Sequence, residues 1–148
     1  MRAVVQRVSS AEVEADGAVT GRIQRGLVVF LGVQSGDTEA DAAYIAAKVT
    51  GLRVFDDADD MPNLSVADIQ GAVLLVSQFT LCADARHGRR PSYIQAARPE
   101  EAIPLYELTV QTLKKSVPVE TGKFQAMMRV RLENDGPHTI LLDSRRLF

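Results

Sequence analysis

The sequence of 148 residues contains one cysteine, two histidines and no tryptophan. A single cysteine, Cys82, excludes an internal disulfide framework and is typical of a protein kept in a reducing compartment. One cysteine and two histidines also fall short of the four ligands of a structural zinc site. We therefore expect no disulfide, no metal site and no cofactor, and a cytoplasmic location.

Long apolar runs are also missing, since none approaches the roughly 20 residues that span a bilayer. Arg2, Gln6 and Arg7 interrupt the first eight residues, where a signal peptide would need a continuous apolar segment. We expect no membrane contact, and the length predicts one domain over residues 1–148. The net charge of −2 gives no general attraction to nucleic acid, so any RNA contact would need a local basic patch.

The segment that organises the chain is 72–81, which reads AVLLVSQFTL. Its first five residues are a short continuous apolar run, typical of a strand buried on both faces. Ser77, Gln78, Phe79 and Thr80 follow directly. Side chains at the end of a buried strand are held rigidly, so this is where a binding or catalytic site is best placed.

The rest of the chain predicts strands with two helices between them. Residues 3–8 are apolar with polar interruptions, and apolar and acidic residues alternate over 11–16, as in a half-buried strand. Asp16-Gly17 is a turn signal before a return strand, 18–23. Further strands are expected at 26–33, 52–55, 124–132 and 139–142. Helices are expected from Asp37 or Thr38 to about Thr50 and from Pro99 to about Ser116, with Ala102, Leu105, Leu108 and Leu113 facing inward. These elements predict a layered α/β or α+β domain with a mixed, mostly antiparallel sheet and two main helices.

Several residues are candidates for nucleophilic catalysis. Ser77, Thr80 and Cys82 are close in sequence, and His87 or His138 could act as a base. No G-x-S-x-G motif surrounds Ser77, and nothing in the sequence fixes a histidine beside a nucleophile. The alternative is that Ser77 and Thr80 cap the strand end and that Cys82 is a small buried apolar residue. Both alternatives stay open at this stage.

Two loops have unusual compositions. Four aspartates in 56–60 form either a solvated acidic turn or a divalent-metal site, although the spacing of a calcium-binding loop is absent. The segment 134–139, NDGPHT, concentrates turn-forming residues and predicts a tight hairpin turn between two strands. Its Gly136 would also let another backbone or a ligand come close.

The sequence as a whole resembles the D-aminoacyl-tRNA deacylase family. The resemblance depends on SQFTL (77–81) after an apolar strand and NDGP-x-T (134–139) near the C-terminus, and it extends to QRV (6–8), GLVVFLGV (26–33), G-x-RPS (88–92) and TGKF (121–124). It implies a homodimer that hydrolyses the ester joining a D-amino acid to the 3′-terminal adenosine of a tRNA. It further implies rejection of L-amino acids, cleavage of glycyl-tRNA as well, and help from the tRNA's terminal 2′-hydroxyl.

The resemblance also assigns roles to residues. Gln78, Phe79 and Thr80 would be catalytic, the last two mainly through their backbone, with Phe79 a stacking surface for adenine. Ser77 would support the turn. Gly136-Pro137, with a cis peptide bond, would reach in from the other subunit and occupy the space of an L side chain.

Three features remain open within this resemblance. Arg7 either braces the Gly-Pro segment or is an ordinary strand arginine. Arg86, Arg89 and Arg90 either contact tRNA phosphates or belong to a solvated loop. His138 occupies a position where many relatives carry valine, so the preference among amino-acid side chains stays open. Two other functions remain alternatives: a nucleic-acid-binding module without catalysis, and an esterase that depends on Cys82 or Ser77.

Overall fold

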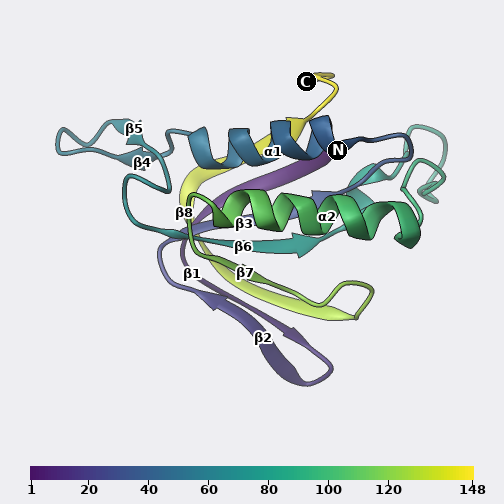
Figure 1. Ribbon diagram of the computed structural model, residues 1–148, viewed down its shortest axis with the longest axis horizontal. Coiled ribbons are helices and arrows are strands. Elements are labelled where there is room, and N and C mark those ends of the chain that lie inside the picture. Colours follow the sequence, from purple (N-terminus) through teal and green to yellow (C-terminus); the bar gives the residue numbers. More distant parts are fainter.

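The computed structural model describes residues 1–148 and is built on one six-stranded mixed sheet (Figure 1). The strand order is β2-β1-β3-β6-β7, and β8 pairs with the other edge of β1. The pairs β1–β2, β1–β3 and β1–β8 are antiparallel, whereas β3–β6 and β6–β7 are parallel. The large sheet contains β1 (Arg2–Ala15), β2 (Ala18–Ile23), β3 (Gly26–Gly32), β6 (Ala72–Ser77), β7 (Val119–Thr121) and β8 (Met128–Asp143).

The remaining elements are two helices, a short two-stranded sheet and one 3₁₀ turn. They are α1 (Glu39–Gly51), α2 (Pro99–Lys114), β4 (Phe55–Asp56), β5 (Pro62–Leu64) and η1 (Phe79–Cys82). Thr38 and Asp41 form a capping box at the start of α1, because each side chain satisfies backbone at the other position. No helix has both the length and the apolar character needed to cross a membrane.

Two apolar clusters fix the position of the central strands. The larger cluster lies between the two helices and one face of β1, β3 and β6. The smaller one lies on the opposite face, where the long strands β1 and β8 curve away with β2 (Figure 1). Val73, Leu74, Leu75 and Val76 are at most 1% exposed, so β6 is buried on both faces as its apolar run predicts.

Most of the expected elements are confirmed, and three details are corrected. The strand expected at 52–55 reduces to the two-residue β4. The strand expected from 124 begins only at Met128, because Ala126 N–H closes a turn on the carbonyl of Lys123. In α2, Leu105 and Leu108 pack against the core as expected but are only half-buried. Tyr106, Thr109 and Val110, which were not expected there, are buried as well.

The expected hairpin turn at 134–139 is wrong. The whole segment lies inside the single strand β8, which pairs with β1 on both sides of it. Gln6 pairs with Thr139 and Val8 with Asn134, so residues 135–138 bulge out opposite Arg7 alone. Turn-forming residues therefore mark a bulge in a continuous strand.

Candidate active site

The end of β6 leads directly into a tight backbone turn. Gln78 N–H donates to the carbonyl of Leu31 at 2.8 Å, which ties the first residue after the strand to β3. The 3₁₀ turn η1 then begins at Phe79 and is closed by Leu81 N–H to the Gln78 carbonyl and Ala83 N–H to the Thr80 carbonyl. The first N–H groups of such a turn find no acceptor within it, so those of Phe79 and Thr80 are not used by the turn itself.

Gly32 lets this turn lie against β3. A Cβ atom at position 32 would lie 2.9 Å from the Gln78 carbonyl oxygen and 3.1 Å from both Cys82 Sγ and Leu81 Cβ. No side chain fits there without moving backbone atoms. The glycine at the end of β3 therefore sets the position of the Gln78 peptide.

The side chains of the turn contact one another and solvent. Gln78 Nε2 donates to Thr80 Oγ1, and no histidine or carboxylate contacts that hydroxyl. Thr80 thus lacks the adjacent base that would make a threonine hydroxyl a nucleophile. Phe79 is 57% exposed, which is unusual for a phenylalanine and leaves more than half of the residue accessible to a ligand.

A largely apolar cavity of about 330 Å³ opens beside Ser77, Gln78 and Phe79. Its other walls come from the start of α2 and from the turn before β8, through Pro99, Ala102, Tyr106, Phe124, Ala126 and Met128. Tyr106 is fixed in this wall because its hydroxyl donates to the Leu75 carbonyl at 2.8 Å. The size and lining suit a flat heteroaromatic group.

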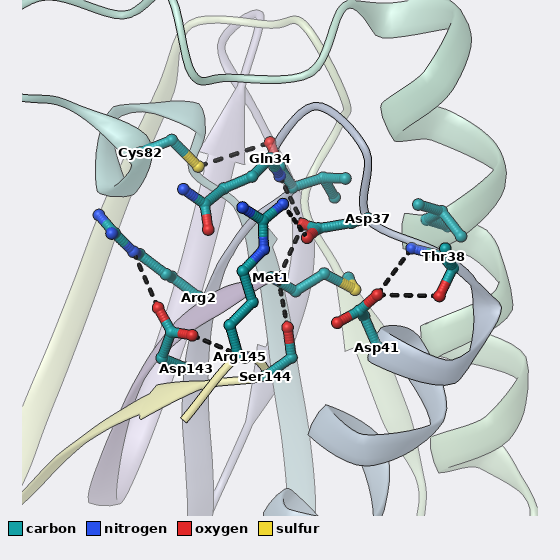
Figure 2. Close-up of polar contacts among 12 residues, drawn as sticks. Met1, Arg2, Gln34, Asp37, Thr38, Asp41, Cys82, Asp143, Ser144 and Arg145 are labelled. Carbon is teal, nitrogen blue, oxygen red and sulfur yellow. Dashed lines mark hydrogen bonds and ion pairs between the residues drawn. The ribbon is translucent and has the colours of Figure 1, made fainter. Parts of the chain in front are cut away.

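Behind the turn, a polar network joins the first residues of β1 to the end of β8 (Figure 2). Arg2 Nε donates to Asp143, and Arg2 Nη1 donates to the Leu81 carbonyl inside η1. The Met1 amino group forms a fully buried ion pair with Asp37 at 2.7 Å. Through Arg2, this network supports η1 at the carbonyl of Leu81.

Cys82 belongs to this supporting layer and is not an activated thiol. It is fully buried, and its Sγ donates to the Val33 carbonyl at 3.4 Å (Figure 2). Burial raises the pKa of the Cys82 thiol to about 11. The thiol is therefore protonated near neutral pH, which favours the buried apolar interpretation over a nucleophile.

Replacing Cys82 with alanine is expected to leave kcat/KM within about twofold of wild type, since no thiolate takes part. Iodoacetamide should also label Cys82 far more slowly in the folded protein than in urea. The kinetics are measured on the Cys82→Ala variant and the labelling on the wild-type protein, with circular dichroism confirming the fold of both. Loss of activity in a folded Cys82→Ala variant would instead restore the thiol to the mechanism.

The bulge in β8 is tied together by one side chain. Asn134 Nδ2 donates to the Arg7 carbonyl at 2.9 Å and to the His138 carbonyl at 3.3 Å, so it joins the two ends of the bulge to β1. The Gly136-Pro137 peptide bond is cis, as expected. A Cβ atom on Gly136 would meet nothing closer than 3.9 Å. The contacts of its own chain therefore do not require glycine at this position.

The Arg7 side chain holds the bulge through the carbonyl groups of the bulge residues. Its Nε donates to the Asp135 carbonyl at 3.0 Å and its Nη2 to the Gly136 carbonyl at 3.4 Å. On the other side, Nη1 donates to the Val54 carbonyl at 2.7 Å and to the Asp56 carboxylate at 3.1 Å. Arg7 is only 6% exposed. Of the two interpretations of this arginine, the structure supports the brace and excludes an ordinary surface residue.

The two candidate regions do not meet within one chain. Ser77 pairs with Leu31, Leu31 with Ala3, and Ala3 with Leu142, which places β8 three strands away from β6. The bulge lies a further four residues along β1, opposite Arg7. Strand spacings of about 4.8 Å and rises of about 3.3 Å put Gly136 on the order of 15–20 Å from Ser77. One ester bond cannot contact both regions of a single chain.

The acidic loop is a structural turn. Asp57 accepts hydrogen bonds from the N–H groups of Asp59 and Met61 and from the Asn63 side chain. These bonds hold the pKa of Asp57 below its usual range. Asp56 contacts Arg7 instead. Asp56 and Asp57 therefore have different partners, and the aspartates of this loop do not gather into a set of metal ligands.

Sequence reasoning missed several residues that shape these regions. Tyr106 in the cavity wall and the tie Asn134 were not singled out as functional, and Asp56 was considered only as a metal ligand and not as a partner of Arg7. Asn134 belongs to the motif 134–139, so that motif was the available signal. No feature of the sequence indicated Tyr106, because its place in the cavity wall follows from the packing of α2 against β6 and β7.

Comparisons with known proteins agree on one family. The family model described as D-Tyr-tRNA(Tyr) deacylase matches residues 4–143. The chain is 59% identical over 149 residues to a D-aminoacyl-tRNA deacylase of Anaeromyxobacter dehalogenans and 55% identical over 150 residues to that of Thermosipho melanesiensis. Each alignment covers 100% of both chains.

Solved structures share the fold. One, named c-Myc DNA Unwinding Element Binding Protein, has a TM-score of 0.91 and 38% identity, with 97% of this chain and 98% of that chain covered. A second, described as "a probable eukaryotic D-amino acid tRNA deacylase", has a TM-score of 0.79 and 16% identity, with 95% and 98% covered. The second shows the likeness of fold alone.

Proposed function

The chain belongs to the D-Tyr-tRNA(Tyr) deacylase family, and we propose that it hydrolyses the ester bond of D-aminoacyl-tRNA to give free D-amino acid and tRNA. The observation that carries this function is the rigid turn at Gln78–Thr80 beside an apolar cavity, at the end of a strand that is buried on both faces. The turn offers backbone donors and a carboxamide, which suit a polarised ester.

The chemistry follows from what the turn provides. Water attacks the ester carbonyl carbon, the bond to the 3′-oxygen breaks, and that oxygen leaves as a hydroxyl. The backbone N–H groups of Phe79 and Thr80 stabilise the oxyanion that develops, and Gln78 contacts the ester. Because no protein base contacts Thr80, the vicinal 2′-hydroxyl of the terminal adenosine assists the attacking water.

The apolar cavity receives the adenine ring. Its lining by Tyr106, Phe124 and Met128 and its volume of about 330 Å³ fit a purine, and the exposed ring of Phe79 adds a stacking surface at the mouth. Ser77 lines the cavity and supports the turn that follows β6. The substrate is thereby held by its adenosine, the part that every aminoacyl-tRNA shares.

Discrimination against L-amino acids comes from Gly136 and Pro137 of a second copy of the chain. The separation of the two regions supports a homodimer, because a complete site then combines Gln78–Thr80 of one subunit with Gly136-Pro137 of the other. Gly136 is glycine although its own chain leaves room for a side chain, which supports a close approach by the substrate. Glycyl-tRNA, without a side chain, would also be admitted. A fully active monomer in solution would contradict this arrangement.

The function is tested by incubating D-tyrosyl-tRNA with the enzyme and measuring the amino acid released. We expect free D-tyrosine and intact, rechargeable tRNA at catalytic enzyme concentrations. An ester that persists in the presence of folded protein would contradict the function. We place the enzyme in the cytoplasm, where its tRNA substrates are used.

Replacing Thr80 with alanine is expected to retain activity within roughly tenfold of wild type, because its part is mainly that of a backbone donor. The lost contact to Gln78 accounts for the decrease. Single-turnover rates on D-tyrosyl-tRNA measure the effect, with thermal unfolding as a control for folding. A collapse to the uncatalysed rate in a folded variant would make Thr80 a nucleophile.

Nucleic-acid binding without catalysis is the second candidate function. It is favoured by the solved relative that is named for binding a DNA element. An extended basic tail or face would support it, yet the net charge here is −2 and the arginines at positions 86, 89 and 90 are confined to one loop. Tight DNA binding together with a persistent D-tyrosyl ester would favour this candidate.

A further inference from the structure

We propose that the hairpin 84–92, with Tyr93 and Ile94 after it, binds the single-stranded 3′ end of the tRNA beside its terminal adenosine. This inference rests on the proposed function, because it assigns the nucleotides upstream of the ester. The sequence alone leaves this basic loop between a solvated loop and a phosphate contact. The backbone hydrogen bonds that close the hairpin, the unpaired arginines at its tip and its contact with Phe79 beside the cavity favour the phosphate contact.

The loop is a closed hairpin with a defined tip. The backbone N–H groups of Asp84 and Ser92 each donate to the carbonyl of the other residue at 2.8 Å. Gly88, at φ +80°, makes the turn between them. Basic side chains are thus presented together on a short arm.

The arginines of this arm differ in their pairing. Arg86 is held by Asp84, with contacts of 2.9 Å and 2.6 Å to its two carboxylate oxygens. Arg89 and Arg90 are exposed and contact no carboxylate. Of the ten arginines outside the hairpin, five contact a carboxylate, namely Arg2, Arg7, Arg22, Arg131 and Arg145, and five do not. The tip of the hairpin therefore carries two adjacent charges that nothing in the chain neutralises.

The arm is joined to the candidate active site by aromatic side chains. The rings of Tyr93 and Phe79 meet edge to face, with centroids 5.3 Å apart. Tyr93 is 42% exposed and Ile94 is 89% exposed, so two further apolar side chains are accessible to a ligand next to the exposed ring of Phe79. Arg90 is three residues from Tyr93, within about 10 Å of it.

Exposed aromatic side chains next to unpaired arginines indicate single-stranded nucleic acid as the partner. Single-stranded nucleic acid binds where bases stack on aromatic or apolar surface and cations follow the phosphates. An RNA strand whose last adenine lies in the cavity would pass Phe79 and Tyr93 before reaching Arg89 and Arg90. The contact is local, which agrees with the net negative charge of the chain.

The test compares two substrates that share the ester. The variant Arg89→Gln/Arg90→Gln is assayed on D-tyrosyl-tRNA and on 3′-O-D-tyrosyl-adenosine, which has no phosphates. On the tRNA ester we expect roughly a tenfold loss of kcat/KM, mostly through KM, and a log–log salt dependence shallower by about 1.4 for two single-strand phosphate contacts. On the adenosine ester we expect no change.

The matched control removes the same charge elsewhere. Lys114 and Lys115 are also adjacent, exposed and without a carboxylate partner, at the far end of α2. The rise of α2 places Lys114 about 12 Å along the helix from Tyr106 and more than about 20 Å from Pro99, which are both in the cavity wall. Lys114→Gln/Lys115→Gln should behave as wild type on both substrates.

Two results would overturn the inference. One is an equal loss on both esters, which would make the hairpin a structural support of Phe79. The other is tRNA kinetics of Arg89→Gln/Arg90→Gln that match those of the lysine control. If wild-type enzyme cleaves neither ester, the proposed function fails separately. Salt-dependent binding of uncharged tRNA to the same variants then decides between a phosphate contact and a solvated loop.

Discussion

Replacing Arg7 with alanine is expected to lower the free energy of unfolding by about 3 kcal/mol and to reduce discrimination between D- and L-esters roughly tenfold or more. The stability loss arises because Arg7 is buried and donates to the carbonyls of Val54 and Asp135. Asp56 and Asp135 are 40% and 45% exposed in their side chains, so water can solvate them and they add little to the loss.

The selectivity loss has a separate cause. Arg7 is the only side chain that donates to the Gly136 carbonyl, which in the proposed site excludes the side chain of an L-amino acid. Without Arg7, the bulge keeps only the tie made by Asn134. Loosening it should admit L-esters more than it slows D-esters.

The Arg7 experiment combines thermal unfolding with rates on D- and L-tyrosyl-tRNA well below the melting temperature. Arg22→Ala is the control, since that arginine is 61% exposed and its ion pair with Glu12 is worth at most about 1 kcal/mol. A folded Arg7→Ala variant with lower stability but an unchanged D-to-L ratio would show that Arg7 has no role in selectivity.

Replacing Gly32 with alanine is expected to lower kcat on D-tyrosyl-tRNA roughly 100-fold, since displacements near 1 Å have effects of that size. The new Cβ atom would lie 2.9 Å from the Gln78 carbonyl oxygen, so the backbone of β3 or of the turn must move. The turn is the less constrained of the two because β3 is paired along both edges. Overpacking should also cost about 1–3 kcal/mol of stability.

Gly51→Ala is the matched control for this change. A Cβ atom at Gly51, the last residue of α1, would meet nothing within 4 Å, so this variant should be fully active and unchanged or slightly more stable. Steady-state kinetics and thermal unfolding of both variants provide the measurement. A Gly32→Ala enzyme with normal kcat would mean that the position of the Gln78 peptide does not limit catalysis.

The strands and helices could be predicted from the sequence because their apolar patterns are strong. The apolar run at 72–76 and the turn signal Asp16-Gly17 specify local structure that the tertiary fold does not override. The candidate turn at Ser77–Thr80 was found for the same reason, since polar residues directly follow a buried strand. These parts of the site depend on local sequence.

The structure of segment 134–139 could not be predicted from local sequence alone. Its turn residues predicted a hairpin, but the strand continues past them because β1 offers partners on both sides of the bulge. The brace formed by Arg7 depends on β4 and β8 meeting at one guanidinium, residues that are 49 and 128 positions away in sequence. Long-range contacts of this kind leave no periodic signal, and only the resemblance to a family suggested a role for this arginine.

The most direct test of the account is the rate of hydrolysis of D-tyrosyl- and L-tyrosyl-tRNA, prepared on the same tRNA, at low enzyme concentration without added metal. We expect rapid loss of the D ester while the L ester decays at its uncatalysed rate. Equal hydrolysis of both esters would contradict it and indicate a nonspecific esterase.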